Sequence, residues 1–260
     1  MARIRLDTLL AERGLFPSRT RAAASVAAGE VLVGDERRAV LRPSAKVADD
    51  VPVALVEAER LVSRGGRKLA NALDAFGLDV GGRAALDVGA STGGFTDVLL
   101  RRGASSVIAL DVAEDELDPA LRADARVHPL RLNARSLTPA ALPFVPDLVV
   151  VDVSFISASK VLPAVLSCVG ERFDALVMVK PQFEVGPARV GKNGVVRDAA
   201  DRREALVSVA RSSDCAVMGF ASSGLPGPKG NRETFVWLAE PGRPGAVVAI
   251  ERAAREVEPS

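Results

Sequence analysis

The stretch "LDVGASTGGFTDVLL", residues 86–100, decides the fold that we expect for this 260-residue chain. An apolar run ends at Asp87, glycines and small hydroxyl residues follow, and a second apolar run begins after them. A strand that turns through glycines into a helix is typical of a nucleotide-type ligand site in an α/β domain. The spacing does not fit the dinucleotide pattern G-x-G-x-x-G, because the residues that follow Gly89 are Ala90 and Ser91.

After residue 60 the chain alternates between apolar runs of strand length and helical patterns. Runs such as "DLVVVDV" and "DALVMVK" suit a parallel sheet that helices cover on both faces. We therefore predict a doubly wound, mostly parallel α/β domain over residues 61–260, whose ligand lies beyond the carboxyl ends of the strands. The predicted strands span residues 84–89, 106–112, 127–132, 147–153, 174–180, 215–221 and 233–239.

The front of the chain has a basic character. In residues 1–46 nine basic side chains outnumber five acidic ones. A helix within "RLDTLLAERG", and a second one that begins after Ser18 and ends at Gly29, precede the strand "VLV". Arginines gather at the ends of both predicted helices, where phosphates could bind. A solvated helical hairpin without an RNA partner is the alternative that the spacing leaves open.

The order of helix, "SRTRA", helix and "GEVLVG" resembles the small RNA-binding module of a small-subunit ribosomal protein, of pseudouridine synthases and of tyrosyl-tRNA synthetases. The resemblance covers roughly residues 3–50 and implies that residues 1–60 form a small α+β RNA-binding domain. The RNA contacts that we expect are Arg5, Ser18, Arg19 and Arg21, with Arg64 and Arg67 at the start of the second domain.

The composition excludes several classes of chemistry. The net charge is +1, so attraction to a polyanion has to come from local patches. The single histidine, His128, leaves no Ser-His-Asp triad, and Cys168 and Cys215 form no CxxC motif. The longest apolar run, "LVVVDVSFI", is too short to cross a bilayer. We expect a soluble cytoplasmic protein with no metal and no membrane partner, and the sequence indicates no oligomeric state.

The pattern D-x-G-x-x-x-G-G, which begins at Asp87, resembles the first motif of S-adenosylmethionine-dependent methyltransferases. That resemblance implies S-adenosylmethionine as the cofactor, with Asp87 near its amino-acid end. Asp111 lies at the end of the second predicted strand, about 20 residues after Gly89, which suits hydrogen bonds to ribose hydroxyls. The cofactor contacts that we expect are Asp87, Gly89, Ala90, Ser91, Thr92, Gly93, Gly94, Phe95, Asp111, Val112, Asn133 and Asp152.

Charged side chains follow the predicted strands at the edge where a ligand would lie. Asp152 comes after the fourth strand and Lys180 after the fifth, while Lys68 and Glu233 come from the two ends of the domain. The fourth strand does not end in the N-P-P-[YF] motif that is typical of methylation of base amines. Methylation of a pyrimidine carbon needs a cysteine nucleophile, and neither cysteine lies at a strand end that could supply one.

Six segments in order resemble the TlyA family, whose members were historically labelled haemolysins. The family joins the RNA-binding module to an FtsJ-like ribose 2'-O-methyltransferase domain. The resemblance implies methylation of cytidine riboses in ribosomal RNA at the subunit interface (23S, with 16S as a further candidate), with an effect on tuberactinomycin sensitivity. It also implies a K-D-K-E tetrad of Lys68, Asp152, Lys180 and Glu233. The segments are "LVSRGGRKL", "LDVGASTGGFTDVLL", "VVVDVSFIS", "VKPQFEVG", "RVGKNGVVRD" and "GPKGNRETF".

Methyl transfer from a sulfonium to a hydroxyl must align three atoms and remove one proton. An amine can accept or guide that proton only if its own pKa is lowered, which burial or a second cation does, whereas neighbouring carboxylates raise it. We assign Lys180 as general base or hydroxyl orienter, Asp152 as its positioning partner, and Lys68 and Glu233 as supporting charges. An ordinary surface ion pair is the alternative for each of the four residues taken alone.

The segment after Asp111, "VAEDELDPALR", departs from the family pattern of a glycine and an aromatic residue near the adenine. We expect Leu117, or the residues around Leu132 and Asn133, to pack there and the cofactor affinity to be reduced. Two aromatic residues near the strand ends, Phe155 and Phe183, are expected either to stack on an unstacked base or to belong to the core.

Three other functions fit the sequence less well. A membrane-active haemolysin requires a basic amphipathic helix or a membrane span, and the sequence shows neither pattern. A non-catalytic RNA-binding protein has no reason to combine Asp87, Asp111 and the tetrad. A nicotinamide-dependent oxidoreductase does not fit the glycine spacing.

Overall fold

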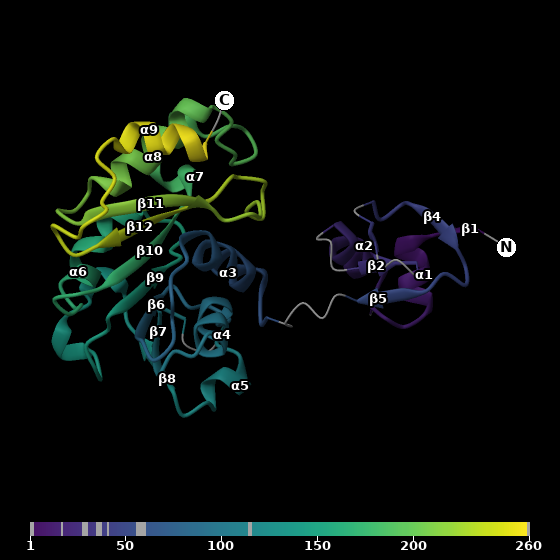
Figure 1. The fold of residues 1–260 in the computed structure, drawn as a ribbon, viewed down its shortest axis with the longest axis horizontal. Helices are drawn as coiled ribbons and strands as arrows, with labels where there is room; N and C mark the ends of the chain where they lie inside the picture. The colour runs from purple at the N-terminus through teal and green to yellow at the C-terminus, as the bar shows by residue number, and fades with distance from the viewer. Residues whose placement is uncertain are drawn as a thin grey trace. The chain divides into compact units, whose positions relative to one another are not determined.

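The computed structural model describes residues 3–16, 18–27, 31–34, 38–40, 42–55, 61–113 and 116–258. The chain divides into two compact units, residues 1–60 and residues 61–260 (Figure 1). Gly29, the predicted end of the second helix, lies outside the described residues. No helix in the described ranges is long and apolar enough to cross a bilayer.

The described part of the first unit contains two helices and two small antiparallel sheets. Helices α1 (Leu6–Glu12) and α2 (Arg19–Ala27) pack together. Their buried side chains form a small core together with Val31, the first residue of the next strand. The core residues are Leu6, Leu10, Ala22, Val26 and Val31. Strand β1 (Arg3–Arg5) pairs with β4 (Lys46–Ala48), and β2 (Val31–Val33) lies between β3 (Arg38–Ala39) and β5 (Val53–Leu55).

The described part of the second unit has one seven-stranded sheet with the order β11-β12-β10-β9-β6-β7-β8. Strand β12 runs antiparallel to both of its neighbours, and the other pairs are parallel. The seven predicted strands are confirmed, with ends that differ by one or two residues. They are β6 (Ala84–Val88), β7 (Ser106–Asp111), β8 (Val127–Arg131), β9 (Leu148–Val151), β10 (Asp174–Val179), β11 (Ala216–Ser222) and β12 (Thr234–Ala239).

Helices cover both faces of this sheet (Figure 1). Val149 and Val151 of β9 pack toward α6, α8 and α9, whereas Leu148 and Val150 pack toward α3 and α4. Side chains alternate between the two faces of a strand, so a continuous apolar run supplies both cores. The helices are α3 (Arg64–Phe76), α4 (Gly94–Arg101), α5 (Pro119–Arg122), α6 (Leu162–Leu166), α7 (Pro181–Glu184), α8 (Ala199–Ala210) and α9 (Ile250–Val257).

The reversed strand β12 brings a late part of the chain to the ligand edge of the sheet. Parallel strands β6, β9 and β10 end at one edge, and a strand that runs antiparallel to β10 begins there. Glu233 directly precedes β12, while Asp152 follows β9 and Lys180 follows β10. These three residues, distant in sequence, therefore reach the same edge.

Candidate active site

A cavity of about 730 Å³ opens at this edge of the sheet. It is lined by the start of α3, by the turn between β6 and α4, and by the segments that follow β9, β10 and β11. All four residues of the predicted tetrad, Lys68, Asp152, Lys180 and Glu233, line it. We term it the tetrad cavity.

The turn between β6 and α4 approaches the neighbouring backbone closely at Gly89. This residue has a φ of +87°, and a Cβ placed on it would lie 2.5 Å from the carbonyl oxygen of Asp152. Neither the conformation nor the space suits a residue with a side chain. Asp111 holds the turn from the other side, because its carboxylate accepts a hydrogen bond from the backbone N–H of Ser91 at 2.9 Å. Residues 89–92 consequently line the cavity with backbone and small side chains.

The glycine pair that follows serves the packing of helices. A Cβ on Gly94 would lie 2.0 Å from Ser63 Oγ, and a Cβ on Gly66 would lie 2.7 Å from the carbonyl oxygen of Gly94. The N-termini of α3 and α4 therefore meet through residues that have no side chain. Gly93, at φ +94°, lies against Leu117, which is buried in the core and does not line the tetrad cavity.

Asp87 is fully buried beneath the turn and does not line the cavity. Its Oδ2 accepts a hydrogen bond from Thr96 Oγ1 at 2.7 Å, whereas its Oδ1 has no hydrogen-bond partner in the part of the chain that the structure describes. Burial raises the pKa of Asp87 to about 7; the hydrogen bond from Thr96 opposes this shift, and the charge of Asp152 adds to it. The sequence predicts that Asp87 contacts the cofactor. In this structure its side chain instead lies buried under the turn, bonds to Thr96, and does not line the tetrad cavity.

The tetrad forms two ion pairs. Lys180 Nζ lies 2.5 Å from Asp152 Oδ1, at an angle that is not that of a hydrogen bond, and donates a hydrogen bond to Ser154 Oγ at 2.7 Å. Lys68 donates a hydrogen bond to Glu233, and the exposed fractions of these two side chains are 9% and 1%. Each lysine is thus held by its own carboxylate, and neither charge of the buried pair is left uncompensated.

Five of the predicted cofactor residues lie outside the lining of the tetrad cavity: Asp87 and Gly93, together with Asp111, Val112 and Asn133. The carboxylate of Asp111 is engaged by the backbone N–H groups of Ser91 and Ala113. Val112 is 59% exposed. Asn133 is exposed and caps a short 3₁₀ helix by accepting a hydrogen bond from the backbone N–H of Arg135 at 3.0 Å.

Two of the predicted RNA contacts in the first unit converge on one buried carboxylate. Arg5 donates hydrogen bonds to Asp7 at 3.0 and 2.7 Å, and Arg19 donates one at 3.4 Å. The hydrogen bonds from Arg5 lower the pKa of Asp7 to about 2, so this carboxylate is charged at neutral pH. Ser18 caps α2, because its Oγ accepts a hydrogen bond from the backbone N–H of Arg21 at 3.2 Å, and the Arg21 side chain is exposed.

The other two predicted RNA contacts lie at the N-terminus of α3. Arg64 is exposed, lines the tetrad cavity, and donates a hydrogen bond to the carbonyl oxygen of Pro226 at 3.5 Å. Arg67 is half-buried.

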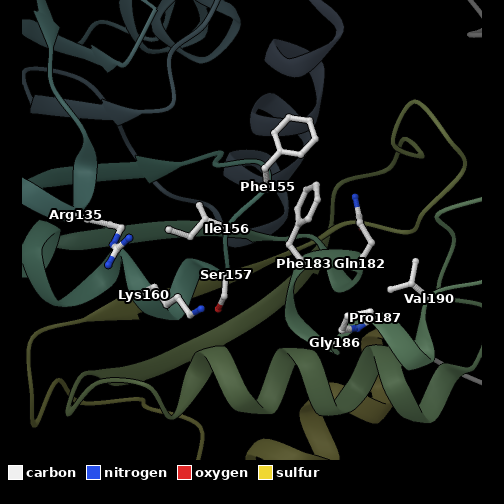
Figure 2. Close-up of a pocket in the computed structure, with 10 residues that line it drawn as sticks. All are labelled: Arg135, Phe155, Ile156, Ser157, Lys160, Gln182, Phe183, Gly186, Pro187 and Val190. Carbon is white, nitrogen blue, oxygen red and sulfur yellow. The ribbon is translucent and has the colours of Figure 1, made fainter.

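Sequence reasoning missed Ser154 and Gln182, which also line the tetrad cavity. Their position directly after a strand end was the signal that could have found them. Phe155 is 92% exposed at a φ of +65°, and its ring lies 5.5 Å from that of Phe183 (Figure 2). The alternative that Phe155 belongs to the core is therefore wrong.

The fold and the site define a class of enzyme. The model of the FtsJ-like methyltransferase family matches residues 61–240 of this chain. A Mycobacterium tuberculosis protein described as 16S/23S rRNA (cytidine-2'-O)-methyltransferase TlyA is 47% identical over 242 residues, which cover 91% of this chain and 90% of that protein. The chain belongs to the TlyA family and is a methyltransferase whose cofactor is S-adenosylmethionine.

Two further relatives carry a haemolysin label. Hemolysin A of Brachyspira hyodysenteriae is 36% identical, over 88% of this chain and 97% of that protein. A solved structure of a haemolysin from Streptococcus thermophilus has a TM-score of 0.73 and 36% identity, and the match covers 99% of this chain and 96% of that one.

Proposed function

We propose that this protein methylates the 2'-hydroxyl of cytidine in ribosomal RNA, either free or within a ribosomal subunit. The observation that carries the proposal is the convergence of two lysine–carboxylate pairs on one cavity beside the glycine turn. The Mycobacterium tuberculosis relative is described as a 16S/23S rRNA (cytidine-2'-O)-methyltransferase, which supports the same acceptor atom and substrate.

The turn fits a cofactor that needs close backbone contact. At Gly89 there is no room for a Cβ against the backbone of Asp152, so the turn and the segment after β9 meet closely at the cavity, and the next three residues have small side chains. S-adenosylmethionine, when bound, supplies an electrophilic methyl group on a sulfonium. The residues of the cavity that would hold it are Gly89, Ala90, Ser91, Thr92, Gly94, Phe95 and Asp152.

Lys180 is positioned to hold the ribose hydroxyl. Asp152 and Ser154 fix its Nζ at 2.5 and 2.7 Å. In this arrangement Lys180 either orients the hydroxyl by donating a hydrogen bond from its ammonium to O2', or, in its neutral amine form, receives the proton that O2' loses. Lys68 and Glu233 compensate each other's charge, so this pair shapes the cavity without adding net charge.

Two features support an RNA substrate. The basic first unit carries exposed arginine such as Arg21, which is suited to phosphate contacts. The exposed Phe155 and its neighbour Phe183, at the rim of the tetrad cavity, offer an aromatic face to an unstacked base.

The test is to incubate the protein and labelled S-adenosylmethionine with isolated ribosomal subunits and with naked ribosomal RNA, and then to cleave the RNA with alkali. A methylated ribose hydroxyl cannot attack its own phosphodiester, so we expect a gap in the ladder at a cytidine. Lys180→Ala should lose about 10²–10⁴-fold in methyl transfer and still bind the cofactor in calorimetry. An unbroken ladder with the wild type, or full activity in Lys180→Ala, would contradict the proposal.

A further inference from the structure

A second cavity, of about 860 Å³, adjoins the tetrad cavity. Figure 2 shows the residues that line it. The two share wall residues, namely Phe155, Gln182, Phe183 and Val190. A ligand that reaches Lys180 in the first cavity can therefore extend past this wall into the second. We term the second one the flanking cavity.

The flanking cavity suits part of a polyanion. Arg135 and Lys160 line it, and its lining, which falls entirely within the described residues, includes no acidic side chain. The carboxylate of Glu184 does not line the cavity but interacts with the charge of Lys160, and it accepts hydrogen bonds from Ser157 Oγ at 2.5 Å and from the backbone N–H of Ala158 at 2.8 Å. Two cations in one cavity with the exposed ring of Phe155 and the half-buried ring of Phe183 are the kinds of group that bind phosphate and base of a single-stranded nucleic acid.

Gln182 is the polar group of the shared wall that has an unmet hydrogen-bonding capacity. Its Oε1 is buried and has no hydrogen-bond partner among the described residues. Because Oε1 is the buried end of the amide, Nε2 is the end that the wall offers to a ligand. In Figure 2 the side chains of Gln182 and Phe183 extend toward the same side, so a base that contacts the ring also reaches the amide.

We propose that Gln182 contacts the Watson–Crick edge of the target base and makes cytosine preferred over uracil. The inference rests on the proposed function, because it assumes that a ribose is held at Lys180. An N–H donor that faces N3 matches cytosine, whose N3 accepts a hydrogen bond, and opposes uracil, whose N3 carries a hydrogen. A site built to hydrogen-bond one partner rejects the analogue that cannot pair.

The experiment uses the full chain and internal competition between two RNAs that differ only by C or U at the nucleotide mapped by alkaline cleavage. The ratio of kcat/KM values for the two RNAs cancels any change in the chemical step that a variant causes. We expect the wild type to prefer the cytidine RNA by about tenfold, which one well-placed hydrogen bond supplies. Gln182→Ala should reduce the preference to within about threefold, and Gln182→Glu should reverse it, because an acceptor then faces N3.

Arg135→Ala is the matched control, because it alters the same cavity but removes a charge contact that both RNAs make. It should lower kcat/KM for both RNAs equally and leave their ratio unchanged. An unaltered ratio in both Gln182 variants, a ratio near one in the wild type, or an equal change of ratio in Arg135→Ala would overturn the inference while leaving the proposed function intact. A wild type that binds cofactor but methylates neither RNA would overturn the proposed function and this inference with it.

Discussion

Asp87 carries a carboxyl group in a fully buried position at the base of the cofactor turn. Its pKa of about 7 lies above the value of about 3.9 for an aspartate in an unfolded chain. The folded state therefore binds this proton more tightly than the unfolded state does. Its contribution to stability is complete below about pH 4 and is lost as the pH rises through about 7.

We predict that Asp87→Asn removes this pH dependence, because an amide stays neutral across the range. Relative to the wild type, the variant should gain thermal stability between about pH 4 and pH 7 and gain little more above it. Thermal unfolding midpoints of both proteins, measured from pH 4 to pH 8, check the difference. Two parallel curves would show that Asp87 does not titrate in this window.

At the scale of elements, the contact between α3 and α4 positions the tetrad cavity. Gly66 of α3 and Gly94 of α4 let the two helix N-termini approach each other, and Ser63 Oγ fills the space that a Cβ on Gly94 would need. Lys68 lies one turn into α3, so the position of its ammonium depends on this contact.

Gly94→Ala should destabilise the second unit by about 1–3 kcal/mol, since overpacking forces neighbouring atoms to move. Adding Ser63→Ala to Gly94→Ala should recover part of the lost stability, because Ser63→Ala removes the hydroxyl oxygen that lies 2.0 Å from the new Cβ. Gly65→Ala is the comparison on the same helix, where a Cβ would lie 3.2 Å from the same Ser63 Oγ instead of 2.0 Å, so a smaller loss is expected. Thermal unfolding of Gly94→Ala, Ser63→Ala, their double variant and Gly65→Ala measures the coupling between residues 63 and 94. If the losses of the two single variants simply added in the double variant, the predicted coupling would be contradicted.

At the scale of the whole molecule, the first unit carries a local excess of basic side chains, and the tetrad cavity lies in the second unit. The chain has a net charge of +1, yet residues 1–46 hold nine basic and five acidic side chains. The tetrad cavity is built entirely from residues of the second unit. Affinity for RNA and affinity for the cofactor should therefore respond to different substitutions.

Arg21→Ala should weaken RNA binding, make the dependence of log affinity on log salt concentration less steep by about one, and leave cofactor affinity unchanged. Arg252→Ala removes the same charge from α9, where Arg252 pairs with Glu256 at 3.0 Å, and serves as the control. Filter binding at several salt concentrations measures both. If log affinity depended on log salt concentration with equal slopes in the two variants, the first unit would not belong to the RNA interface.

Local patterns were enough to predict the sheet strands and the order of the motifs. Apolar runs such as β9 and β10 are set by the sequence of a few residues, and the turn at Gly89 requires a positive φ that glycine adopts. The positions of Asp152 and Lys180 at strand ends follow from the same patterns. Contacts such as that of Gly94 with Ser63 could not be predicted, because they depend on how two helices pack.

The sequence by itself determined which segments become strands and helices, where the glycine turn lies, and which charged residues follow the strands. The spacing of apolar residues and the residue types in turns are set within a few residues, so these features can be predicted without knowing the fold. The tertiary structure alone decided that Lys68 pairs with Glu233, 165 residues away, and that Asp87 is fully buried and bonded to Thr96. Such pairings depend on the reversal of β12 and on the approach of α3 to α4, which place distant segments together in ways that no local pattern specifies.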